Sequence, residues 1–90
     1  MHAEILIPQI LKHLINGIDT VNVTGRTIGE CLNDLVSQFP QLRTRLFKSN
    51  NELADYYEVF INGKSAYPNE LLKPVNDGDR IVVVNIIEGG

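Results

Sequence analysis

The feature that most constrains the fold is the apolar run RIVVVNII at residues 80–87. Six of its eight residues are isoleucine or valine, whose branched side chains favour strands. A strand without alternating polar and apolar residues is typically covered on both faces or paired between two other strands. The turn residues NDGD at positions 76–79 mark its start. We therefore expect residues 80–87 to form the central strand of a sheet.

Two other segments alternate polar and apolar residues, as strands with one solvated face do. The first is AEILIP at residues 3–8, which ends at a proline that cannot donate to a strand ladder. The second is DTVNVTG at residues 19–25, which follows the turn residues NG at positions 16–17. We expect the two segments to pair as a hairpin. Its core face would comprise Ile5, Ile7, Val21 and Val23.

One helix is predicted to begin at Thr27. Thr27 and Glu30 have the spacing of a capping box, in which the hydroxyl accepts from the N–H three residues on and the carboxylate bonds back to the cap. Pro40 disfavours helical geometry at the residue before it, so the helix ends there. Apolar residues recur at steps of three and four and would form one stripe facing the core. The stripe comprises Ile28, Cys31, Leu32, Leu35, Val36 and Phe39.

The middle of the chain contains a second hairpin. Residues 41–55 have an ambiguous pattern that allows a short helical turn before a polar loop. The segment YYEVFING at residues 56–63 alternates again and ends in Asn-Gly, a strong hairpin signal. A short strand is expected to follow near residues 65–67. The inward face of the longer strand would carry Tyr57, Val59 and Ile61.

The order of these elements predicts the fold class. Strand, strand, helix, strand, short strand and strand leave too little of a 90-residue chain for two helical layers. We expect an α+β fold of the β-grasp type, a mixed sheet of four to five strands with one main helix on one face. Its first and last strands would be parallel neighbours, as a right-handed crossover allows. Residues 1–90 would form a single domain with a flexible tail at residues 86–90.

The charge and hydropathy of the chain argue against several classes of function. The formal net charge is −3 and the eight Lys and Arg residues are scattered, so no nucleic-acid partner is expected. No apolar run approaches the ~20 residues of a membrane span, so no membrane association is expected. Glu4 stands where a signal peptide would carry positive charge. The default expectation is a cytoplasmic protein.

The inventory of reactive side chains is short. Cys31 is the one cysteine, which excludes an internal disulfide, and with His2 and His13 it does not form a zinc-type cluster, so no metal site is expected. A catalytic Cys/His pair is an alternative, but a lone cysteine on an apolar helix face is more often a core residue. Paired carboxylates and phosphate-binding glycine loops are not identifiable. We therefore expect a protein that is not itself an enzyme.

The final residues NIIEGG pair the predicted central strand with two glycines. A chain of average glycine usage ends this way only about once in two hundred cases. Residues 86–90 could extend at most roughly 17 Å, enough to place the Gly90 carboxylate inside a partner's cleft. Glycine lets other atoms approach its carbonyl carbon closely. A carboxylate becomes reactive only when an activating enzyme supplies ATP and a metal ion. The alternative is a frayed end with incidental glycines.

The stretches GRTIGECLNDLVSQFPQLRTRL, FING and NDGDRIVVVNIIEGG resemble the MoaD/ThiS family of ubiquitin-like sulfur carriers, and the resemblance covers nearly the whole chain. It implies that a MoeB/ThiF-like enzyme, using ATP and Mg²⁺, adenylates the Gly90 carboxylate. Sulfur from a persulfide then displaces AMP and leaves a thiocarboxylate, with no cofactor bound tightly to the carrier. The opening IPQIL and the 90-residue length resemble the MoaD-like and CysO-like members more than the shorter ThiS type, so a function like that of the molybdopterin synthase small subunit is expected, with a MoaE-like recipient. In other branches the recipient would be a cysteine or thiamin biosynthetic enzyme.

The resemblance also implies a surface that docks partners. Strand alternation places Leu6, Phe60, Val82 and Val84 on the face away from the helix, where they would form an exposed apolar patch unless a loop covers them. The tail residues Ile86, Ile87, Glu88 and Gly89 would enter the partner with Gly90. Many MoaD-like members carry proline or small residues before the two glycines. The bulkier residues in this chain leave the identity of the recipient open.

Two other classes of function fit the same sequence. A ubiquitin-like protein modifier would use the activated carboxylate to acylate a lysine of another protein. A β-grasp interaction module would use only its surface, with a passive tail.

Overall fold

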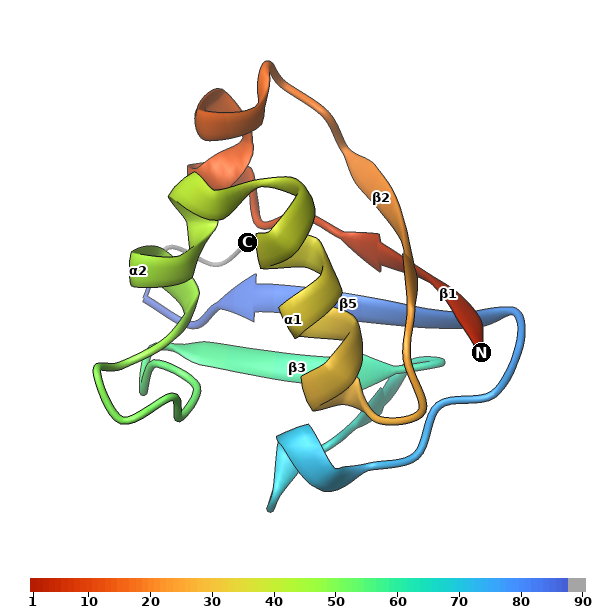
Figure 1. Ribbon diagram of the computed structural model, residues 1–90. Coiled ribbons are helices and arrows are strands. Elements are labelled where there is room, and N and C mark those ends of the chain that lie inside the picture. Colours follow the sequence, from red (N-terminus) through yellow and green to blue (C-terminus); the bar gives the residue numbers. More distant parts are fainter. Residues whose placement is uncertain (88–90) are drawn as a thin grey trace.

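This computed structural model describes residues 1–87 of the chain. They fold around a five-stranded mixed sheet (Figure 1). The spatial order is β2-β1-β5-β3-β4, in which β5 runs parallel to β1 and antiparallel to β3. This arrangement confirms the predicted β-grasp and the central place of the last strand. The strands are β1 (His2–Leu6), β2 (Thr20–Thr24), β3 (Tyr57–Ile61), β4 (Lys64–Ser65) and β5 (Asp79–Asn85).

The main helix, α1 (Ile28–Gln38), packs on one face of the sheet (Figure 1). Its cap forms as predicted, because the Thr27 hydroxyl accepts the N–H of Glu30 at 3.1 Å. The Glu30 carboxylate differs from the prediction, since it accepts the N–H of Arg26 at 2.7 Å, one residue before the cap. No helix within residues 1–87 is long and apolar enough to cross a membrane.

The shorter helical segments flank α1. They are η1 (Gln9–Ile15), η2 (Pro40–Leu42), α2 (Arg43–Leu46) and η3 (Glu70–Leu72), of which all but α2 are 3₁₀ helices. The helical turn allowed for residues 41–55 is present as η2 and α2. In contrast, η1 was not indicated by any pattern, although it buries Leu11 and Ile15.

The hydrophobic core lies between the sheet and α1. Ile5 and Val59 are fully buried and flank β5 in register with Ile81 and Val83, which point to the same side. Burying a side chain of this size contributes about 1.5–3 kcal/mol. Cys31 is also fully buried, and burial raises the pKa of its thiol. It is therefore a core residue, as expected.

Hydrogen bonds from the turn NDGD hold the start of β5 next to β1. Gly78 adopts φ +86°, a left-handed conformation that residues with a Cβ rarely take. This conformation lets its N–H donate to the His2 carbonyl at 2.8 Å. The Asp77 carboxylate accepts the His2 N–H, also at 2.8 Å. The turn therefore holds both main-chain groups of His2.

Asp79 fastens the same end of β5 to the second hairpin. Its carboxylate accepts the Asn76 N–H at 2.8 Å and the Asn62 amide at 2.9 Å. Asn62, at φ 51° in the turn between β3 and β4, in turn accepts the N–H of Arg80 at 3.0 Å. The hydrogen bond from the Asn76 backbone, followed by that from Asn62, lowers the pKa of Asp79. The start of β5 is thus fixed on both sides.

Candidate functional site

The opposite end of β5 leads to the predicted reactive terminus. The N–H of Ile86 donates to the Tyr56 carbonyl at 2.9 Å, and the N–H of Ile87 donates to the Asn85 side-chain oxygen at 2.9 Å. The main chain at both residues is therefore held by the domain, although their side chains are 56% and 76% exposed. The maximum reach of roughly 17 Å, which assumes that residues 86–90 are fully extended, therefore does not apply to Ile86 and Ile87. Glu88, Gly89 and Gly90 lie outside the described residues.

The buried side-chain amide of Asn85 positions the main chain where it leaves β5. Asn85 is only 5% exposed, on the helix-facing side of β5, and pairs in register with Tyr57 of β3. Burial raises the pKa of the Tyr57 hydroxyl, and a hydrogen bond from the Asn85 side chain acts in the opposite direction. Asn85 thus links the core to Ile87, the second residue after β5. The sequence reasoning missed this role. Its one signal was a single polar residue within an apolar run.

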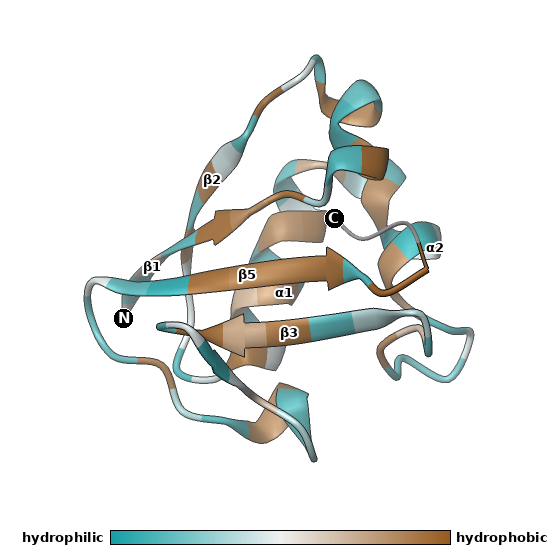
Figure 2. Cartoon of the chain, turned by 180° about the vertical axis from the view of Figure 1, so that it is seen from behind, coloured by the Kyte–Doolittle hydropathy of each residue, from teal (hydrophilic) through white to brown (hydrophobic). Residues whose placement is uncertain are grey.

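The four predicted docking residues lie together on the sheet face opposite α1. In the strand register, Val82 sits between Leu6 of β1 and Phe60 of β3, and Val84 follows on β5. All four are half-buried, whereas Ile5, Val59 and Val83 next to them along the strands are buried. Figure 2 views the sheet from this side, with the apolar segment of β5 in front and α1 behind it. The predicted orientation is found, and the role in docking stays a prediction.

Charged residues border this apolar patch along the strands. Arg80 and Glu4 form an ion pair at 3.6 Å beyond Val82 and Leu6. Glu58 lies opposite Val84 at the other end. An exposed ion pair contributes only about 0–1 kcal/mol to stability. The charges that border the patch therefore contribute little to folding.

The described residues offer little for catalysis within the chain itself. No group of three or more His, Cys, Asp or Glu side chains within residues 1–87 is arranged to hold a metal ion. Cys31 is fully buried, and the raised pKa of its thiol disfavours the nucleophilic thiolate. The arrangement instead presents a main chain that is held in place as it leaves β5, next to an apolar surface.

Comparison with known proteins gives one family. Residues 5–90 match the ThiS family. The sulfur carrier protein CysO of Mycobacterium tuberculosis is 25% identical over 93 residues, which span all of both chains. The small archaeal modifier protein 1 of Haloferax volcanii is 34% identical over 71 residues, 78% of each chain.

The structural comparison agrees with the sequence comparison. A chain of the Amycolatopsis orientalis BexX/CysO complex superimposes with a TM-score of 0.86 at 27% identity, covering 98% of this chain and 99% of that one. The similarity therefore extends over the sheet, the helix and the patch, and is not limited to the terminal motif.

Proposed function

Because the chain belongs to the ThiS family of ubiquitin-like sulfur carriers, we propose that it carries sulfur as a thiocarboxylate on Gly90. The observation that supports this proposal most directly is the way in which the main chain is held where it leaves the sheet at the end of β5. The central strand of the sheet ends at Asn85, whose buried side chain fixes the following main chain next to a half-buried apolar face. The proposal requires the chain to end at Gly90 in the cell.

The proposed chemistry places the carrier in the role of a substrate. The Gly90 carboxylate attacks the α-phosphate of ATP in a partner enzyme and releases pyrophosphate, which turns the carboxylate oxygen into part of a good leaving group. A sulfide equivalent then attacks the acyl carbon, AMP departs and a thiocarboxylate remains. Glycine suits both steps because a Cβ would crowd the acyl carbon. Mg²⁺ would be bound by the partner with ATP.

We assign the apolar patch to the activating partner, which would be MoeB/ThiF-like. Leu6, Phe60 and Val82 form a continuous row across three strands, and Val84 extends it toward the exit. A partner that covers this row can receive Ile86 and Ile87 at the same time, since both side chains are exposed. The complex of a CysO protein with BexX in Amycolatopsis orientalis shows that a protein of this fold assembles with another protein.

The recipient of the sulfur is the finer part of the proposal. The relatives reported above are a CysO sulfur carrier and a small archaeal modifier, and neither is named as a molybdopterin synthase subunit. A CysO-like branch, with a biosynthetic enzyme as recipient, is therefore favoured over a MoaE-like recipient. The bulky residues Ile86 and Ile87 would have to fit that recipient's entrance.

A protein-modifier function is the second candidate. The 34% identity to small archaeal modifier protein 1 supports it, and both functions use the same activated carboxylate. They differ in the nucleophile that attacks Gly90, which is a sulfide equivalent in one case and a lysine amine in the other. The third candidate function is that of a β-grasp interaction module, whose tail is passive and carries no sulfur.

Intact mass spectrometry tests the leading proposal. The full chain is incubated with ATP, Mg²⁺, a MoeB/ThiF-type enzyme and a sulfur donor, and the expected result is a mass gain of one sulfur-for-oxygen exchange. Deletion of Gly90 should abolish the gain, and so should one alanine added after Gly90. If the added alanine leaves cellular function intact, the passive module is correct instead. Protein adducts cleaved by an isopeptidase but not by thiol would identify a modifier.

A further inference from the structure

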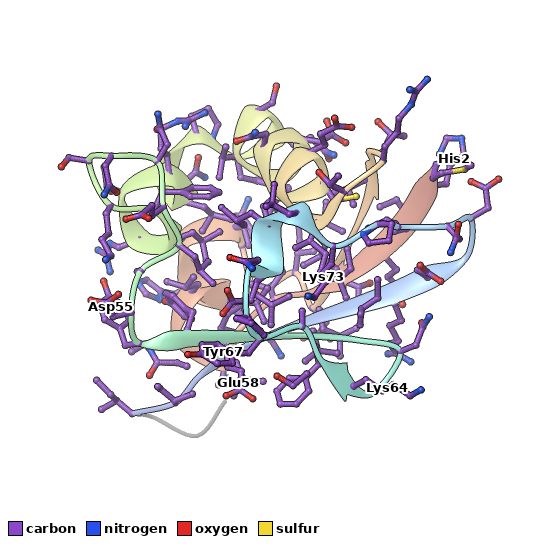
Figure 3. All side chains as sticks on the ribbon, turned by 90° about the horizontal axis from the view of Figure 1, so that it is seen from below. His2, Asp55, Glu58, Lys64, Tyr67 and Lys73 are labelled. Carbon is purple, nitrogen blue, oxygen red and sulfur yellow. The ribbon has the colours of Figure 1, made fainter. Side chains whose placement is uncertain are left out.

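A groove lies beside the first half of β3, and the sulfur-carrier chemistry does not use it. Its volume is about 590 Å³, within the roughly 300–1,000 Å³ range of ligand-binding pockets. One wall is the loop at residues 52–55, and the other is the segment at residues 67–72. Glu58 of β3 and Ile86 also line the groove. In Figure 3, Tyr67 and Glu58 are seen at this edge of the sheet.

The wall at residues 67–72 is held against the start of α1. The N–H of Ile28 donates to the Lys73 carbonyl, directly after this wall, at 3.0 Å. A Cβ at Gly29 would lie 2.9 Å from the Leu71 carbonyl oxygen, so the lack of a side chain at Gly29 lets the wall pack against the helix. The position of this wall is therefore fixed by the main helix.

The wall at residues 52–55 is held by α2 and by the loop itself. The N–H of Ala54 donates to the Leu46 carbonyl at 2.8 Å, and the N–H of Lys48 donates to the Glu52 carbonyl at 2.8 Å. The side chains of Lys48 and Asp55 form an ion pair at 2.9 Å. Both walls are thus positioned by the domain before any partner binds. A binding site that is formed in advance loses less conformational entropy on binding.

Large apolar side chains of the groove are accessible to a partner. Tyr67 and Leu72 are 73% and 75% exposed, and Ile86 is 56% exposed. Exposed apolar side chains that gather in one place mark interaction sites. Tyr57 also lines the groove but is only 5% exposed, so a partner would contact side chains rather than the main chain of β3.

The charges of the groove select its occupant. Four carboxylates line it, those of Glu52, Asp55, Glu58 and Glu70. Glu52 accepts the Asn50 amide at 2.6 Å, and Asp55 has the ion pair described above. Glu58 and Glu70 are half-buried, and their carboxylates have no hydrogen bond or ion pair within residues 1–87. A partly desolvated carboxylate without a partner is unfavourable, so a cation bound in the groove would be stabilised.

A guanidinium group suits both the free carboxylates and the apolar walls. It is planar and presents its donors as a fork that matches carboxylate oxygens. The same group stacks on an aromatic ring such as that of Tyr67. A lysine ammonium is a compact, strongly hydrated charge that cannot make the bidentate contact. The groove therefore fits arginine better than lysine, and it repels acidic side chains.

We propose that the groove is a second docking site, into which a partner protein inserts an arginine side chain flanked by apolar residues. The arginine supplies the counter-charge that Glu58 and Glu70 lack, and its neighbours cover the exposed apolar side chains. Because Ile86 lines the same groove, the partner lies beside the place where the main chain leaves β5. The site does not depend on chemistry at Gly90, so it stands or fails independently of the proposed function.

The test is a titration of the full ¹⁵N-labelled chain with the capped peptide GLRLG, followed by two-dimensional NMR. We expect saturable shifts of the amides at Glu58, Glu70 and Leu72, while the amides of β2 stay unchanged. The capped peptide GLKLG should bind at least about threefold more weakly. The capped peptide GLELG should produce no shifts. The proposal is wrong if GLRLG gives no saturable shifts at these amides, or if the lysine or glutamate peptide binds as tightly.

Charge-matched variants locate the binding site. Glu58→Gln combined with Glu70→Gln removes the two free carboxylates and should weaken GLRLG binding about three- to tenfold. Tyr67→Ala, at an exposed position, should weaken it about threefold because the aromatic ring is lost. Asn33→Lys combined with Ser37→Lys makes the same change in net charge on exposed positions of α1 and should leave binding unchanged. Equal weakening by the two charge-changing pairs would indicate attraction by net charge alone and would overturn the proposal.

Discussion

The two faces of β5 carry similar apolar side chains in different surroundings. Ile81 and Val83 point toward α1 and are 0% and 2% exposed, whereas Val82 and Val84 point away and stay half-buried. The inward row also begins and ends with polar residues, Asp79 at the turn and Asn85 at the exit. The comparison teaches that one face of the strand supplies stability and fixes its ends, while the other contributes less to packing, which is why we propose it for recognition.

The largest expected effect lies in the middle of the inward row. Ile81→Ala should lower the free energy of unfolding by about 2–5 kcal/mol, because it leaves a cavity in a fully packed site. Val82→Ala, its neighbour on the open face, should cost about 1 kcal/mol or less. Urea unfolding of both variants measures the difference. Equal losses would show that the open face is packed as tightly as the core.

A smaller effect is expected at the end of the inward row. Asn85→Ala removes the acceptor of the Ile87 N–H and the partner of the buried Tyr57 hydroxyl, at a cost of about 1–3 kcal/mol. Hydrogen exchange at the Ile87 amide should accelerate in the same variant. Tyr57→Phe, the control, removes only the hydroxyl and should leave exchange at Ile87 unchanged. Unchanged exchange in Asn85→Ala would contradict the role assigned to Asn85.

At the start of the inward row, the expected effect depends on pH. The hydrogen bonds from Asn76 and Asn62 hold the pKa of Asp79 below its ordinary value of 3.8, so the native state favours the ionised form. The contribution of Asp79 to the free energy of unfolding is therefore complete at pH values above its ordinary pKa. It is lost as the pH falls through the lowered pKa of the native state. Asp79→Asn should lower Tm at neutral pH, and the difference from the parent chain should close under strong acid. A pH-independent difference would exclude the ionised carboxylate as the cause.

The smallest effect on folding is expected on the open face, together with a large effect on binding. Phe60→Glu should change the free energy of unfolding by about 1 kcal/mol or less, because Phe60 is only half-buried. Affinity for the MoeB/ThiF-type enzyme should fall, since the charge lies in the middle of the patch. Ser37→Glu, on an exposed position of α1, should bind as the parent chain does. An unchanged affinity for Phe60→Glu would remove the patch from the interface.

Local patterns predicted most of the fold. The apolar run after NDGD identified the central strand, the spacing of Thr27 and Glu30 located the start of α1, and Asn62-Gly63 located a hairpin turn. These features were readable because each depends on neighbours in the sequence. Alternation also oriented the docking residues correctly, because side chains along a strand point to opposite faces in turn.

Contacts between distant residues were not readable in the same way. The partnership of Asn85 with Tyr57 joins two strands, and the bonds of Gln38 and Asp34 to β2 join a helix to an edge. The 3₁₀ helix η1 also went unpredicted, although its buried side chains complete the core. In each case the stabilising partner lies far away in the chain, so a local pattern carries no sign of it.

The sequence by itself determined the order of the strands and the main helix, the face of each strand and the family, since these follow from periodicity, turn residues and motif. Only the tertiary structure decided that side chains of α1 close the β2 edge of the sheet, and how the main chain is held at Ile86 and Ile87. The physical reason is that hydrogen bonds across a sheet depend on which strands become neighbours, and burial depends on what packs against each face.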